Sequence, residues 1–222
     1  MNINFHALDS PVAIQNLTSL VIENQAVFTH LVAELYAYET ESQTDVRLFD
    51  NRYNYLKPTE LLVITDVLRE NLNTPTVLRH IYKDLETHLN LAPERKTAIE
   101  DLLAQAWGLL NEELVEFELD LASSKMHLPE AFKGFNIRVD TQARTIFEKI
   151  QEILTLYKYL SKKRLLVLVN LSLFLNQQEL AAVAEAIELQ RLTVLMVDPR
   201  SFDPPAGVKQ VVMDHDMVVI TT

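Results

Sequence analysis

Short apolar runs alternate along this chain with stretches in which apolar residues recur at helical spacing. The runs are apolar at every position and occupy residues 20–22, 61–64, 165–169, 194–197, 211–212 and 217–220. Such runs indicate strands that are buried on both faces of a sheet. Residues 46–49 give a weaker signal, which we interpret as an edge strand.

Helical patterns separate these runs. Apolar residues from Val27 to Tyr36 share one helix face, and Asn176 with Glu179 three residues later forms a capping box before a second helix. Apolar strands that alternate with amphipathic helices are typical of a parallel sheet covered on both faces. We therefore predict an α/β fold with a mainly parallel sheet.

The middle of the chain has little strand signal, apart from a weak one at residues 137–139. Two long helical patterns dominate it. One begins near Pro93 and places Ile99, Leu102, Leu103, Ala106 and Leu110 on one apolar face, and the other covers residues 146–157. We predict an α/β head domain, residues 1–75 and 160–222, with an inserted helical leg domain, residues 76–159.

Composition removes several classes of function. The chain has no Cys, which excludes disulfides, thiol catalysis and Cys-based metal centres. Its first residues have neither a basic residue nor a long apolar stretch, and no apolar segment reaches the ~20 residues of a membrane helix. We therefore expect a cytoplasmic protein without a membrane partner.

Two predicted strands lead into an acid, Asp66 and Asp198, as in nucleotide-binding proteins where such an Asp holds Mg²⁺. A phosphate-binding loop also needs glycines, because backbone N–H groups must approach the anion. The only three glycines, at 108, 134 and 207, form no such motif. The two acids therefore fit strand-end turns, and a divergent metal-dependent NTPase or nuclease that uses them is the enzymatic alternative.

A net charge of −11 argues against a nucleic-acid partner, but the charge is unevenly distributed. Residues 84–120 hold ten acids and two bases, for a net −8, whereas residues 133–164 hold eight bases and three acids, for a net +5. The acidic stretch ends in residues 116–121, EFELDL, whose alternation would project carboxylates from one side of an extended chain.

Each charged segment allows two interpretations. The carboxylates of residues 116–121 suit either Ca²⁺, which binds oxygen ligands on loops, or a solvated acidic face. Lys162, Lys163 and Arg164 either complement the dipole of a preceding helix or contact phosphates.

Several segments together resemble the Csn-two family of type II-A CRISPR–Cas loci. They follow the family order over nearly the whole chain: VIENQ (21–25), LFD (48–50), LKPTELL (56–62), TD (65–66), IYKDLE (81–86), EFELDL (116–121), TIFEK (145–149), YLSKKRLL (159–166) and PR (199–200). The resemblance implies a head related to phosphate-loop NTPases that lacks the loop, and a helical leg.

The resemblance also implies a non-catalytic, ring-shaped homotetramer. It would bind double-stranded DNA ends in a basic central hole, be stabilised by Ca²⁺ and act in spacer acquisition beside the CRISPR integrase complex and the RNA-guided effector nuclease. By position, it assigns calcium to Glu113, Glu116, Glu118 and Asp120, and DNA to Lys133, Lys149, Lys162, Lys163 and Arg164. The segment Ala122-Ser123-Ser124 departs from the family, whose acids continue there. An acidic scaffold that contacts only proteins is a third hypothesis.

Overall fold

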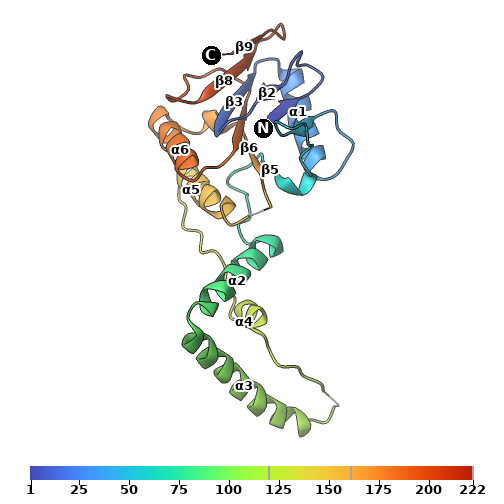
Figure 1. Ribbon diagram of the computed structural model, residues 1–222, viewed down its shortest axis with the longest axis vertical. Coiled ribbons are helices and arrows are strands. Elements are labelled where there is room, and N and C mark those ends of the chain that lie inside the picture. Colours follow the sequence, from blue (N-terminus) through green and yellow to red (C-terminus); the bar gives the residue numbers. More distant parts are fainter. Residues whose placement is uncertain (120, 161, 222) are drawn as a thin grey trace. The chain divides into compact units, whose positions relative to one another are not determined.

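The computed structural model describes residues 1–119, 121–160 and 162–221 and divides the chain into two compact units (Figure 1). The head unit comprises residues 1–70 and 141–222, and the helical unit comprises residues 71–140. The predicted insertion ended at residue 159, but in the structure helix α5 (Ile146–Tyr157) belongs to the head unit, because it packs against helix α6 (Gln177–Leu189).

A six-stranded sheet forms the centre of the head unit, with the strand order β5-β6-β7-β3-β8-β9. All neighbours pair in parallel except β8 and β9, which are antiparallel. The fold is therefore the predicted α/β class with a mainly parallel sheet. The strands are β3 (Leu17–Ile22), β5 (Leu61–Ile64), β6 (Leu165–Val169), β7 (Val194–Asp198), β8 (Lys209–Met213) and β9 (Val219–Thr221).

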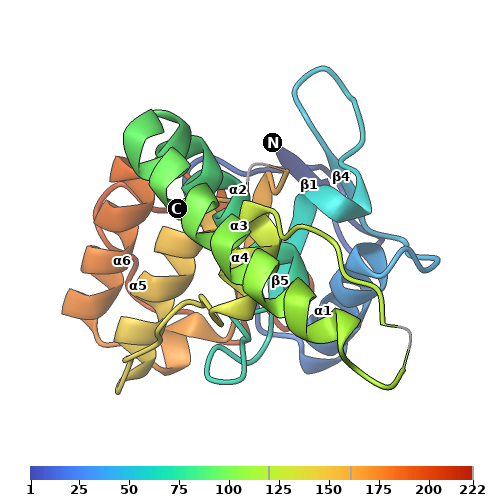
Figure 2. The ribbon, with the colours of Figure 1, turned by 90° about the horizontal axis from the view of Figure 1, so that it is seen from below.

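Helices cover the two faces of this sheet. Helix α1 (Gln25–Glu39) lies on one side of the sheet, and helices α5 and α6 lie on the other (Figure 2). The residues of β6 and β7 are all buried, as strands sandwiched between two helical layers must be. Asn176 caps α6 and forms the predicted capping box with Glu179.

A small antiparallel sheet packs with α1 on the same side, in the strand order β2-β1-β4. Its strands are β1 (Asn2–Asn4), β2 (Val12–Ala13) and β4 (Arg47–Phe49), so the predicted edge strand at 46–49 is present. Ile3, Phe5, Val46 and Leu48 point from this sheet into the main core, where they meet Leu31 and Leu35 of α1.

The helical unit contains α2 (Pro75–Asn90), α3 (Pro93–Val115) and α4 (Leu128–Gly134). The weak strand signal at 137–139 is wrong. The Val139 backbone instead exchanges hydrogen bonds of 2.8 and 3.1 Å with the Asn73 side chain, and the Tyr82 hydroxyl donates to the Ile137 carbonyl at 2.8 Å. No described helix combines the length and the apolar character that crossing a membrane requires.

Candidate nucleic-acid interface and acidic segment

The basic segment Lys162-Lys163-Arg164 lies between α5 and the amino end of β6. Since Leu61 pairs with Leu165, the register places Arg164 beside Glu60, one residue before the paired strands. The Arg164 N–H donates to the Glu60 carbonyl at 2.7 Å, and the two side chains form an ion pair at 3.7 Å. The Arg164 side chain keeps 44% of its surface exposed.

Lys163 turns inward. Its ammonium lies 3.7 Å from the Glu39 carboxylate at the end of α1 and donates a hydrogen bond to the Leu61 carbonyl of β5. The Lys163 and Glu39 side chains are only 20% and 21% exposed, and Glu39 also accepts the Val63 N–H at 3.2 Å. Lys163 therefore ties α1 to the edge of the sheet.

Two acids near Lys163 have raised pKa values. Burial raises the pKa of Glu39, against the opposing effects of Lys163 and the Val63 N–H. Burial also raises the pKa of Glu70, and the negative charge of Glu39 raises it further, while Lys149 and Lys163 act in the opposite direction. The ammonium groups of Lys149 and Lys163 thus compensate carboxylates within the fold.

The other predicted DNA-binding residues differ in accessibility. Lys149 is 11% exposed in its side chain and pairs with Glu152 at 3.8 Å. Lys162 is exposed and forms no ion pair with any described residue. Lys133 is exposed in the last turn of α4, in the helical unit. The structure therefore leaves Lys133, Lys162 and Arg164 accessible and gives Lys149 and Lys163 internal partners.

Arg52 and Arg164 line the same hollow of about 350 Å³, together with Asp50, Asn54 and Thr193. Asp50 accepts the N–H groups of Arg52 and Asn54, at 2.8 and 3.0 Å, and so fixes the turn that carries Arg52. Sequence reasoning missed Arg52, because 112 positions separate it from Arg164 and only the sheet brings them together.

The acidic segment follows α3. Glu113 is exposed in the last turn of this helix, and Glu116 and Glu118 are exposed in the turn beyond it. Residues 116–119 form a turn and bends and are not part of a strand. Asp120 lies outside the described residues.

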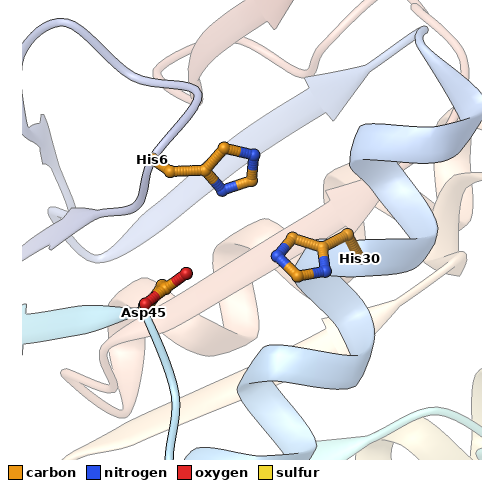
Figure 3. A group of neighbouring side chains, drawn as sticks. All are labelled: His6, His30 and Asp45. Carbon is orange, nitrogen blue, oxygen red and sulfur yellow. The ribbon is translucent and has the colours of Figure 1, made fainter.

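Ser123 connects the loop that follows the acidic segment to α3. Its hydroxyl accepts the Trp107 indole N–H at 3.1 Å and donates to Asn111 at 3.2 Å. Among the described residues, one group of three potential metal ligands has all its ligand atoms within 4.8 Å of one another. This group is His6, His30 and Asp45 (Figure 3). Glu113, Glu116 and Glu118 thus do not form a calcium cage in this conformation.

Asp66 and Asp198 lie at the carboxyl ends of β5 and β7 in very different environments. Asp66 is exposed, caps the turn formed by residues 66–69 and pairs with Arg69 at 3.6 Å. Asp198 is fully buried, and one of its oxygens accepts the Ser172 N–H at 2.9 Å and the Ser172 hydroxyl at 2.6 Å. Burial raises the pKa of Asp198, against the opposing hydrogen bonds from Ser172.

Fold and site together define a class: a mainly parallel α/β protein without a glycine phosphate loop, which has an inserted helical unit and segregated charge. The family model of CRISPR-associated protein (Cas_Csn2) matches residues 37–217. The chain belongs to this CRISPR-associated Csn2 family, which confirms the resemblance seen in the sequence.

Two relatives support this membership along most of the chain. CRISPR-associated protein Csn2 of Enterococcus faecalis is 40% identical over 200 residues, covering 90% of each chain. Csn2 of Streptococcus agalactiae is 38% identical over 221 residues, covering 99% of this chain and 97% of the relative. Their names describe a CRISPR association and no catalytic activity.

The fold also matches a solved structure, "Crystal structure of Stu0660 of Streptococcus thermophilus". The TM-score is 0.58 at 15% identity, and the match covers 100% of this chain and 76% of that chain. At this identity the match supports the fold alone.

Proposed function

We propose that this protein is a non-catalytic, sequence-independent binder of double-stranded DNA ends, and that it acts as a ring-shaped homotetramer during CRISPR spacer acquisition. Membership of the CRISPR-associated Csn2 family carries the proposal. The segregation of an acidic stretch from a basic one supports it, because a polyanion would be repelled from one surface and attracted to another.

The accessible cations are the proposed phosphate contacts. Lys133, Lys162 and Arg164 from the sequence prediction are exposed, and Arg52 shares a hollow with Arg164. Point charges of this kind bind backbone phosphates and carry no sequence information. We assign Lys149 and Lys163 to the fold instead, since each has an internal carboxylate partner.

Assembly is supported by the apolar surface of α3. None of its 23 residues, all of which are described, is buried, and Leu102, Leu109 and Leu110 are 65%, 68% and 55% exposed. These three residues lie on one helix face because they are spaced seven and eight residues apart. An exposed apolar face of this kind is typical of a protein interface, here with further copies of the chain.

Calcium is part of the proposal as the ion that stabilises the assembled ring. Its proposed ligands are Glu113, Glu116, Glu118 and Asp120, since carboxylate oxygens suit this hard cation. The first three do not converge in the isolated chain, so binding would require the segment after Val115 to rearrange. The CRISPR integrase complex and the RNA-guided effector nuclease are the proposed protein partners.

The proposal is tested by measuring affinity for a linear duplex as a function of salt. Log affinity should fall linearly with log salt and be the same for unrelated sequences. Lys162→Ala should reduce the slope by about 0.9 for each phosphate that the lysine neutralises in the wild-type chain. If the protein does not bind DNA at low salt with Ca²⁺ present, the alternative of a scaffold that contacts only proteins is favoured. If it cuts DNA or hydrolyses nucleotides with Mg²⁺, and Asp66→Ala or Asp198→Ala abolishes this activity, the enzymatic alternative is favoured.

A further inference from the structure

A histidine and an aspartate lie just beyond the paired strands β1 and β4. The last antiparallel pair is Asn4 opposite Arg47, and His6, in a turn, and Asp45, in a bend, each lie two residues beyond this pair. Phe5 and Val46, between them, are buried in the core, which leaves His6 and Asp45 on the outer face. Two potential metal ligands thus leave the sheet side by side.

Helix α1 supplies the third ligand. His30 lies one helical turn before Glu34, and residues at this spacing share a helix face. The Glu34 carboxylate accepts the Asp45 N–H at 2.6 Å, and its carbonyl accepts the Thr44 hydroxyl at 3.1 Å. These bonds hold the Asp45 backbone against the helix face that carries His30.

The three side chains converge on one point, as Figure 3 shows. The imidazoles of His6 and His30 lie edge to face with ring centroids 5.0 Å apart, and the ligand atoms of all three residues lie within 4.8 Å of one another. A tetrahedral ion with bonds of ~2.1 Å needs ligand atoms about 3.4 Å apart. All three side chains are exposed, so each can change rotamer to bring its ligand atom closer, and Glu34 fixes the backbone of Asp45.

We propose that His6, His30 and Asp45 bind a divalent transition-metal ion of the Zn²⁺ class. Two imidazoles and one carboxylate suit Zn²⁺, whereas Ca²⁺ takes oxygen ligands, so this site is chemically distinct from the proposed calcium segment. His6 and Asp45 also line a hollow of about 320 Å³ with Asn4, Phe5, Leu8 and Arg47. A metal ion held by three protein ligands keeps a fourth position for water or a small anion, and Arg47 lines the hollow next to His6 and Asp45.

The test is a titration of the tag-free full chain with Co²⁺, whose visible absorption intensifies in a tetrahedral site, followed by displacement with Zn²⁺. One ion should bind per chain, and an excess of Ca²⁺ should not displace it. His6→Ala, His30→Ala and Asp45→Asn should each weaken binding by at least about tenfold. His88→Ala removes an exposed histidine of α2 and should change nothing.

Circular dichroism and the melting temperature in chelator should match wild type for all four variants, because the ligands are exposed. The proposal is overturned if no intense absorption develops, if Ca²⁺ competes, or if His88→Ala weakens binding as much as the ligand variants do. Replacing Glu118, a proposed calcium ligand, or Lys162, a proposed DNA contact, should leave Co²⁺ binding unchanged, so this result is separate from the fate of the proposed function.

Discussion

Lys163 should be needed for stability and not for contact with DNA. Lys163→Ala removes the ammonium that lies 3.7 Å from Glu39 and caps the Leu61 carbonyl, and it leaves a carboxylate that is 21% exposed without its cation. Removing one partner of a buried pair costs about 3–5 kcal/mol, and removing one of a surface pair costs about 0–1 kcal/mol. This pair is four-fifths buried, so we expect a cost of about 2 kcal/mol.

A destabilisation of this size should lower the melting temperature by about 4–8 °C for a chain of this length. Lys162→Ala is the matched control, because the neighbouring lysine is exposed, and it should change stability by less than about 0.5 kcal/mol. The destabilisation in Lys163→Ala should be larger at neutral than at acidic pH. Glu39 already has a raised pKa from burial, and without Lys163 its charged form becomes still less favourable.

Thermal unfolding by circular dichroism measures both variants, and a double-mutant cycle with Glu39→Gln isolates the pair. The coupling free energy should be about 1–2 kcal/mol, and a Lys163→Met, Glu39→Gln chain should be more stable than Lys163→Ala. A Lys163→Ala chain that melts within about 1 °C of wild type would refute the structural role. The ammonium would then again be a candidate for phosphate contact.

Three further predictions concern the buried acid, the acidic segment and α3. Because the folded pKa of Asp198 is raised above 3.8, its contribution to stability is fully present below pH 3.8 and is lost as pH rises through the folded pKa. The free energy of unfolding of Asp198→Asn, measured in urea, should therefore rise relative to that of wild type from about pH 4.5 to about pH 7.5. A difference between the two chains that stays constant over this range would contradict the prediction. Glu116→Ala with Glu118→Ala should abolish the rise in melting temperature on adding Ca²⁺, whereas Glu94→Ala with Asp101→Ala, with the same charge change, should keep it. Leu109→Glu should reduce the mass measured by light scattering toward that of one chain, whereas Leu189→Glu on α6, at a leucine that is also exposed, should not. Equal masses would refute the α3 interface.

Strands buried on both faces could be predicted because each is a continuous apolar run, as in β6 and β7. The strands β1 and β2 could not, since two or three residues are too short to show a period. The alternation of residues 116–121 did not decide the backbone conformation, because a period of two forms a strand only where a partner strand pairs with it. Residues 116–119 form a turn and bends after α3.

Charge counts located the basic segment but not its partners. Lys163 and Glu39 are 124 positions apart, and the parallel pairing of β5 with β6 brings them together. His6 follows β1, His30 lies in α1 and Asp45 precedes β4. They share no local spacing, so only the pairing of β1 with β4 and the position of α1 place them together. Pairings of this kind depend on tertiary structure and leave no pattern in the sequence.

The most direct measurement compares one relaxed, covalently closed DNA circle before and after a single restriction cut. The two forms have the same length and sequence and differ only in having ends. The protein should bind the cut form in a gel-shift assay with Ca²⁺ and leave the closed circle unbound, because a ring can load only over an end. Equal affinity for both forms would contradict the account.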